Sequence, residues 1–244
     1  MASIHEGHRG RLKRRFLRDG LDGFEPHEAL ELLLYFGIPQ GDTNPLAHRL
    51  LDRFGSLEAV LMAPAHELMK VPGVGEHTAV LLRLIAPFMR KCQGPQPGEL
   101  LDTSVRALAH ASSLFYGRPR ETFFLLSLDS RTRLIAADLM AEGTATSAAV
   151  SVRAVTERAL ARGAAQVILA HNHPGGVALP TYEDRFLTRK IATSLALVEI
   201  PVLDHLIFGM EESQYSFRQA NLMDEVYEEV ALRVNQDLTP YRKA

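Results

Sequence analysis

The sequence predicts two parts of different fold class, an α-helical N-terminal domain and a mixed α/β C-terminal domain. Residues 5–92 place apolar side chains at helical spacing without a convincing strand, whereas strand-like and helix-like segments alternate after residue 102. Two prolines and two glycines fall within residues 93–98, which is typical of a linker. The expected divisions are a helical domain over residues 1–92, a linker over 93–101, an α/β domain over 102–222 and a C-terminal helical tail over 223–244.

Two helices of the N-terminal domain have recognisable ends. Residues 26–36 start with Pro26 and continue as an apolar stripe, and residues 44–55 start with an Asn-Pro pair and stop at Gly55. Proline suits the first turn of a helix because the backbone N–H that it lacks would have no helical partner there. Both segments therefore support an all-helical domain.

Residues 68–82 read as a helix, a tight Gly-x-Gly turn and a second helix, and look like a helix-hairpin-helix motif. Gly73 and Gly75 would let the backbone approach a phosphate, and the amides at the next helix start favour an anion. This pattern predicts contact with double-stranded DNA, independent of base sequence. The alternative is a packing unit that touches no DNA, and Glu76 directly after the turn is unfavourable for phosphate.

Charge is nearly balanced over the chain, with 27 Lys and Arg against 29 Asp and Glu, so no overall field favours nucleic acid or membranes. Residues 5–18 depart from this balance with six Lys or Arg and one acid. Such a run is either a solvated helix face or, beside a phosphate-binding element, part of a DNA contact.

The elements expected in the α/β domain follow one another in a regular order. We expect helices at residues 103–115, 152–162 and 181–195, and strands at 121–129, 133–140, 166–171 and 202–208. In folds of this kind a functional site is expected at the ends of the strands.

Two histidines and one aspartate form the most informative pattern in the chain. His171 and His173 are two residues apart at the end of a strand-like run, so their rings share one face. Asp184 follows a loop that contains Pro174, a Gly pair and Pro180. Two imidazoles and one carboxylate leave a fourth tetrahedral position for water, which is the pattern of a catalytic zinc site rather than a structural one.

A second interpretation of Asp184 involves no metal. Thr181 and Asp184 have the spacing of a capping box, with Thr181 as the N-cap residue of the helix and an acid three positions later. The two roles are compatible, because one carboxylate has two oxygens.

The segment from His171 to Asp184 resembles the JAMM (MPN+) metalloprotease signature, His-x-His-Pro followed by Ser-x-x-Asp, in the version found in the bacterial RadC family. Flanking residues 142–144, 164–170 and 202–205 and the N-terminal third of the chain also resemble RadC sequences. The resemblance implies a cytidine-deaminase-like α/β fold and one zinc ion bound by His171, His173 and Asp184. It also implies hydrolysis of a peptide or isopeptide bond in an unidentified protein substrate.

The resemblance further implies two catalytic roles. Glu121, just before the first strand of the domain, matches the glutamate that serves as general base, with Glu142 and Glu183 as competitors. Thr181 stands where the family has a serine that donates to the oxyanion, and its extra methyl puts the rate in doubt. Residues 151–154 (Ser-Val-Arg-Ala) replace a His-Pro-Arg-Glu found in many members, so the helix start there is expected to be rearranged.

Other features narrow the class of protein. No run of 18 apolar residues and no signal peptide is present, which predicts a cytoplasmic protein without membrane association. The single cysteine, Cys92, excludes a thiolate cluster, so a zinc site must use histidine and carboxylate.

His205 follows Asp204 in an apolar strand and is either a partner of a metal ligand or a core histidine. The alternatives to a peptide or isopeptide hydrolase are a metal-dependent nuclease and a non-enzymatic DNA-binding repair or recombination factor.

Overall fold

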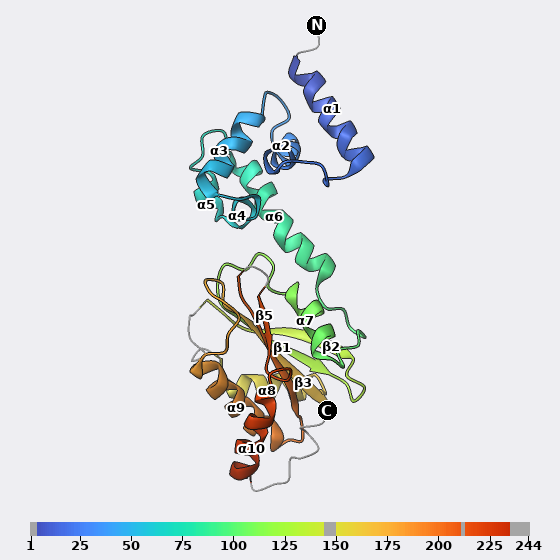
Figure 1. Cartoon of the computed structure of the whole chain (residues 1–244), viewed down its shortest axis with the longest axis vertical. Coiled ribbons are helices and arrows are strands. Elements are labelled where there is room, and N and C mark those ends of the chain that lie inside the picture. The colour runs from blue at the N-terminus through green and yellow to red at the C-terminus, as the bar shows by residue number, and fades with distance from the viewer. Residues whose placement is uncertain (1–3, 144–149, 211–212, 235–244) are drawn as a thin grey trace. The chain divides into compact units, whose positions relative to one another are not determined.

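The computed structural model describes residues 4–143, 150–210 and 213–234. The chain divides into two compact units, Met1–Met89 and Arg90–Ala244, and the boundary falls within a helix. The first unit is entirely helical and the second contains one sheet with helices, which confirms the expected helical and mixed α/β parts (Figure 1).

Six helices make up the described part of the first unit. They are α1 (Ile4–Asp19), α2 (Pro26–Gly37), α3 (Asn44–Phe54), α4 (Leu57–Met62), α5 (Ala65–Leu68) and the first part of α6 (Glu76–Gln93). Pro26 and Gly55 lie at the predicted helix start and end, and Gly55 has a positive φ of 89°. Leucines from α2, α3 and α5 are fully buried in one core, while Leu12 of α1 packs beside Tyr35 of α2 in a smaller cluster.

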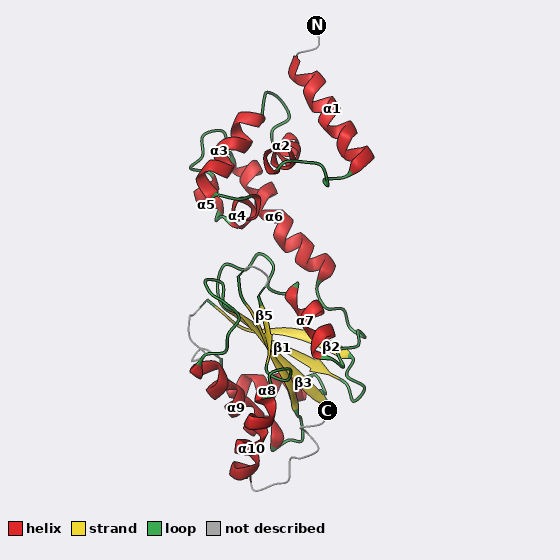
Figure 2. Ribbon diagram, viewed as in Figure 1, coloured by secondary structure: helices red, strands yellow, loops and turns green. Residues whose placement is uncertain are grey.

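The sheet of the second unit has five strands in the order β2-β1-β3-β4-β5. Figure 2 draws the strands in yellow. They are β1 (Thr122–Leu128), β2 (Leu134–Glu142), β3 (Gln166–Asn172), β4 (Val202–Phe208) and β5 (Gln214–Ser216). Strands β3 and β4 are parallel, and the other pairs are antiparallel. The first four strands lie where the sequence predicts strands. Strand β5 was not predicted, because its three residues are too few for a periodic pattern.

Helices cover both faces of the sheet (Figure 1). On one face lie α8 (Val152–Ala161), α9 (Tyr182–Ala196) and α10 (Leu222–Val234), and on the other lies α7 (Ser104–Ser112). The split follows from strand periodicity: Leu125 and Leu169 belong to the core under α8–α10, whereas Leu126 and Ala170 belong to the core under α7. The sheet is therefore the central layer of a three-layer domain.

Two segments expected to lie outside the α/β domain belong to its packing. Helix α10, placed by the sequence in a tail over residues 223–244, buries Tyr227 and Val230 in the core beneath α9. At the other end, Leu101 of the expected linker over 93–101 is buried against α7, and Leu100 bridges to Arg133. The apolar side chains in both segments explain this, because each finds an uncovered face of the sheet. Residues 235–244 lie outside the described residues.

The start of α8 is an ordinary capped helix. The Ser151 hydroxyl accepts a hydrogen bond from the Ala154 N–H at 3.2 Å, and the helix begins at Val152. Serine is among the most favourable N-cap residues. The substitutions at residues 151–154 therefore leave a stable helix start. Within the residues described, none of the helices combines the length and apolar character needed to cross a bilayer.

Candidate metal centre

Three side chains from two elements converge at the end of strand β3. His171 Nε2 lies 2.9 Å from His173 Nε2 and 3.1 Å from Asp184 Oδ1, and His173 Nε2 lies 3.4 Å from Asp184 Oδ2. His171 and Asp184 are buried, and His173 is partly exposed. The structure thus brings together the three residues that the sequence singled out. His171 lies on β3, His173 directly follows the strand, and the first turn of α9 brings Asp184 to both.

The donor set and its spacing fit a zinc ion. Atoms that share one tetrahedral zinc at about 2.0–2.1 Å lie roughly 3.3 Å apart, which is close to the observed distances. His173 Nδ1 lies 3.2 Å from the Val177 carbonyl oxygen, and a carbonyl oxygen only accepts, so this nitrogen carries the proton of the neutral ring. The Nε2 of neutral His173 then presents a lone pair to the cluster. Its three donor groups could hold a metal ion.

Asp184 divides its two oxygens between two functions. Oδ2 accepts from the Thr181 N–H at 2.8 Å and from the Thr181 hydroxyl at 2.7 Å, and the Asp184 N–H donates back to that hydroxyl at 3.1 Å. This is the predicted capping box at the start of α9. Oδ1 faces His171 and is the oxygen available to a metal ion.

The Thr181 hydroxyl donates its only proton to Asp184. A hydroxyl has one proton to donate, and here it points at the Asp184 carboxylate. In this arrangement Thr181 holds the side chain of a candidate metal ligand in place. The oxyanion role expected from the family resemblance would require this hydroxyl to turn away from Asp184.

The electrostatics of the cluster follow from burial and mutual contact. Burial by itself would raise the pKa of Asp184. His171 and His173 outweigh burial when their Nε2 atoms carry a proton, because they then donate to this carboxyl and hold its pKa far below its usual range. The hydrogen bond to Asp184 raises the pKa of His173 against the opposing effect of burial. A cation at this position, whether a proton or a metal ion, is therefore strongly favoured.

Glu121 lies beside the cluster at the start of β1. It is half-buried, burial raises its pKa, and the charges of His171, His173 and Asp184 act on it. A carboxylate with a raised pKa beside a metal site is suited to accept a proton. The two competing glutamates are less suited. Glu142 is paired with Arg118 and Arg120, and Glu183 is exposed to solvent.

Asn172 fixes the backbone on both sides of Glu121. Its side-chain Oδ1 accepts from the Thr122 N–H at 2.8 Å, and its Nδ2 donates to the Arg120 carbonyl at 3.4 Å. Because Asn172 lies between the two histidines on β3, the same strand end positions His171 and His173 together with Glu121. No role was expected for Asn172 from the sequence. Its position between two candidate ligands was the one sequence signal, and its burial is evident only in the structure.

The loop between His173 and Thr181 rests on the end of β4. Gly176 accepts a hydrogen bond from the Met210 N–H at 2.8 Å, and the Ala178 N–H donates to the Ser213 hydroxyl at 3.2 Å. A side chain at Gly209 would come within 2.6 Å of backbone atoms of residues 176 and 178. Glycine at position 209 is therefore required for this close approach.

His171 contacts a second histidine behind the cluster. Its Nδ1 lies 2.8 Å from Nε2 of His205, and Nδ1 of His205 lies 2.6 Å from the Thr188 hydroxyl of α9. Burial lowers the pKa of His205 well below its usual value. The structure thus places His205 as a partner of His171, one of the two roles that the sequence left open. Thr188 was missed, because only the packing of α9 on β4 brings it there.

Asp204, the neighbour of His205, belongs to a different buried cluster on the α7 face. Its carboxylate accepts hydrogen bonds from the hydroxyls of Ser104 and Ser216, both at 2.6 Å, and from the N–H groups of His205 and Arg218 at 2.8 and 2.9 Å. Burial raises its pKa. These four bonds tie α7, β4 and β5 together, which is a structural role.

The helical unit contains the turn expected to bind DNA. Gly73 has a φ of 100°, a conformation that glycine adopts without strain, and Gly75 immediately precedes α6. The helix before the turn, α5, has only four residues. Gly73 and Gly75 are exposed, and so is Glu76 in the first turn of α6.

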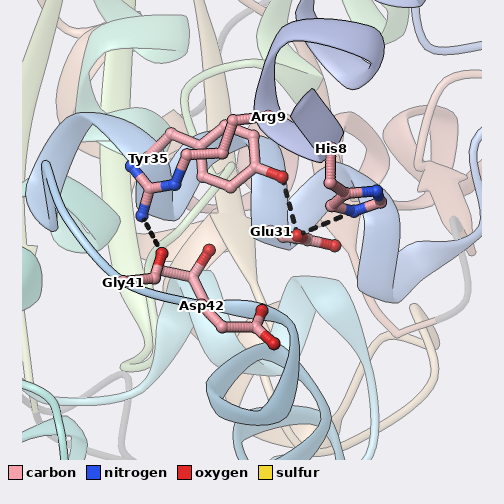
Figure 3. A pocket seen from close by; sticks show the side chains of 7 residues that line it. His8, Arg9, Glu31, Tyr35, Gly41 and Asp42 are labelled. Atoms are coloured by element: carbon pink, nitrogen blue, oxygen red, sulfur yellow. Dashed lines mark hydrogen bonds and ion pairs between the residues drawn. The ribbon is translucent and has the colours of Figure 1, made fainter. Parts of the chain in front are cut away.

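Part of the basic run in α1 holds this unit together. The Arg9 guanidinium donates to the carbonyls of Ile38 and Pro39. It also donates to the Gly41 carbonyl and lies over the Tyr35 ring (Figure 3). His8 and Tyr35 both contact buried Glu31 in the same small polar cavity. The side chains of Arg11, Lys13 and Arg14 remain exposed. The run is therefore neither wholly a solvated face nor wholly available to a partner.

Comparison with known proteins identifies the C-terminal unit. Residues 101–222 match the model of the RadC-like JAB domain family. A UPF0758 protein of Burkholderia thailandensis is 37% identical over 210 residues, which cover 85% of this chain and 80% of the relative. UPF0758 proteins of Burkholderia mallei and Burkholderia pseudomallei are 38% identical over 210 residues, covering 85% of this chain and 75% of each relative. JAB domains are typically metal-dependent, in agreement with the three converging donors. This chain belongs to the RadC family.

Proposed function

We propose that this protein is a zinc-dependent hydrolase of the JAMM type that cleaves a peptide or isopeptide bond with a metal-activated water. The convergence of His171, His173 and Asp184 beside half-buried Glu121 carries this proposal. Two nitrogens and one carboxylate oxygen are the donors of a catalytic rather than a structural zinc site.

Each side chain of the centre has a distinct task in such a reaction. A zinc ion would lower the pKa of a bound water from about 15.7 to about 7 and polarise the scissile carbonyl. Glu121 would take the proton from the attacking water and return it to the leaving amine, since its raised pKa suits both transfers. Thr181 would keep Asp184 in place through the capping box and, after rotation of its hydroxyl, donate to the developing oxyanion.

The test separates metal binding from proton transfer. Purified protein is analysed for zinc content and incubated with libraries of peptides and of isopeptide-linked peptides. We expect stoichiometric zinc, loss of zinc in His171→Ala, and in Glu121→Gln normal zinc with cleavage reduced roughly 10²- to 10⁴-fold. Glu183→Gln is the matched control and should retain cleavage. Equal zinc in His171→Ala and in the parent would refute the metal site, and full cleavage by Glu121→Gln would refute the role of Glu121.

A second proposal concerns the exposed glycine turn of the helical unit. We propose that Gly73 and Gly75 contact the backbone of double-stranded DNA, supported by the positive φ at Gly73 and by exposed Arg11, Lys13 and Arg14. Binding to a labelled duplex should weaken with salt, and Arg11→Glu should weaken it further. An affinity for the duplex that does not change with salt concentration would contradict DNA backbone contact. Cleavage of the duplex by the parent protein, absent in Asp184→Ala, would instead support a nuclease.

A further inference from the structure

A continuous chain of hydrogen bonds runs from α9 through β4 to β3 behind the metal centre. The Thr188 hydroxyl oxygen lies 2.6 Å from the Asp184 carbonyl oxygen, one turn earlier in α9, and 2.6 Å from His205 Nδ1. His205 Nε2 lies 2.8 Å from His171 Nδ1. All four residues are buried, and Thr188 and His205 are completely inaccessible to solvent.

The direction of every bond in this chain follows from its carbonyl end. A carbonyl oxygen only accepts, so Thr188 donates its single proton to Asp184. The Thr188 oxygen then accepts from His205, which places the ring proton of His205 on Nδ1. His205 lies between the rings of Phe123 and Phe217, where a charged imidazolium is unfavourable. Its Nε2 is therefore a bare acceptor.

A bare Nε2 on His205 determines the protonation of His171. Only Nδ1–H of His171 can form the 2.8 Å contact, so the Nε2 of neutral His171 keeps its lone pair and faces His173 and Asp184. We infer that His205 and Thr188 are positioning residues that hold His171 as the Nδ1–H tautomer, with Nε2 ready to bind the metal ion. The inference rests on the proposed metal site, although the tautomer itself does not require an ion.

His173 provides an internal comparison for this inference. It has the same tautomer for a different reason, since its Nδ1 faces the backbone carbonyl of Val177. Changes at His205 or Thr188 should therefore alter His171 and leave His173 unaffected. Metal ligands commonly donate their second nitrogen to such a partner, and removal of that partner typically costs 10- to 100-fold in metal affinity.

The first test reads the tautomers directly in the metal-free protein. Two-bond ¹H–¹⁵N correlation spectra of the full chain with labelled histidine, at mildly alkaline pH, distinguish protonated from bare ring nitrogens. We expect His205 and His171 each protonated at Nδ1 and bare at Nε2. A proton on Nε2 of His205 would overturn the inference whatever the zinc content, whereas the expected tautomers without any zinc binding would refute only the proposed function.

The second test uses two threonines of α9 that make the same bond. Thr188→Val removes the hydroxyl from the chain, and Thr193→Val removes an equivalent bond from Thr193 to the Arg189 carbonyl on the same helix. We expect Thr188→Val to produce some of the opposite tautomer of His205 and to weaken zinc binding about 10-fold. Thr193→Val should change neither. Equal tautomers and equal zinc affinity in the two variants would overturn the role of Thr188.

The third test asks whether the acceptor on His205 is what matters. Glutamine can place an acceptor oxygen near the Nε2 position of histidine, whereas leucine offers none. We expect His205→Leu to weaken zinc binding by about 10- to 100-fold and His205→Gln to restore most of it. Loss of equal size in both variants, with both folded by circular dichroism, would show that His205 only fills space and would overturn its positioning role.

Discussion

Two buried polar clusters lie on opposite faces of the sheet at neighbouring residues of β4. Asp204 faces α7, and its carboxylate receives four hydrogen bonds, so each of its oxygens meets two donors. His205 faces α9 and contacts His171, which belongs to a cluster in which the Nε2 atoms of His171 and His173 and the two carboxylate oxygens of Asp184 face one another at 2.9–3.4 Å. The Asp204 cluster is balanced, because every acceptor position of the carboxylate has a donor. The cluster at His171 is unbalanced, because it has more acceptor atoms than protons to share among them.

The difference shows that comparing the numbers of hydrogen-bond donors and acceptors can distinguish a structural polar cluster from a candidate functional one. Buried acceptors that face each other repel unless a cation lies between them, and an unpaired buried polar group costs about 1–3 kcal/mol. The Asp204 cluster meets its own requirements and needs no ligand. The cluster at His171 meets them only with an added proton or metal ion, as we expect of a cation-binding site.

The largest expected effect comes from replacing the carboxylate of the unbalanced cluster. Asp184→Asn should lower zinc affinity by more than roughly 100-fold, beyond the loss caused by removing a ligand's hydrogen-bond partner. Zinc titration monitored by calorimetry measures this effect. The amide oxygen can still accept from Thr181, so we expect α9 to remain folded. Undiminished affinity would show that Asp184 serves the capping box alone.

Replacing the aspartate of the Asp204 cluster by asparagine should lower the stability of the protein and leave its zinc affinity unchanged. Asp204→Asn places an amide N–H₂ against hydrogen-bond donors, and we expect the free energy of unfolding to fall by about 1–3 kcal/mol. Zinc affinity of the folded protein should be unchanged. Urea denaturation with parallel zinc titration measures both quantities. Unchanged stability together with lost zinc would reverse the comparison between the clusters.

A smaller, graded effect is expected from pH. His173 has a raised pKa in the folded protein, so its protonated pair with Asp184 stabilises the metal-free protein below the unfolded pKa of histidine. That stabilisation is lost as pH rises through the raised pKa. Zinc competes with the same proton, so zinc affinity should rise over the same interval. Thermal unfolding of the zinc-loaded and the chelator-treated protein, measured across this pH interval, checks the expectation. The same pH dependence of the unfolding temperature in both samples would contradict a site shared by zinc and the proton.

Much of the fold could be predicted from periodicity, and the rest depended on tertiary contacts. The His-x-His spacing on β3 predicted that two rings share one face, and the Thr181–Asp184 spacing predicted the capping box. Helix α10 carried a visible apolar pattern, but only the sheet shows that its side chains complete a core. Thr188 and Asn172 act through partners 17 and 50 residues away in sequence, a relation that local pattern does not encode.

Asp184 caps the start of α9 and is also a proposed zinc ligand, so formation of the first turn of α9 and zinc binding should be coupled. Its carboxylate reaches the histidines only when the first turn of α9 is formed, since that turn fixes the direction of the side chain. An ion that binds only this folded arrangement must stabilise it, by an amount that grows with ion concentration relative to the dissociation constant. Amide protons at the start of α9 should then exchange more slowly with solvent deuterium in the zinc-loaded protein. Local fraying of one helix end would thus report how much of the protein carries its ion.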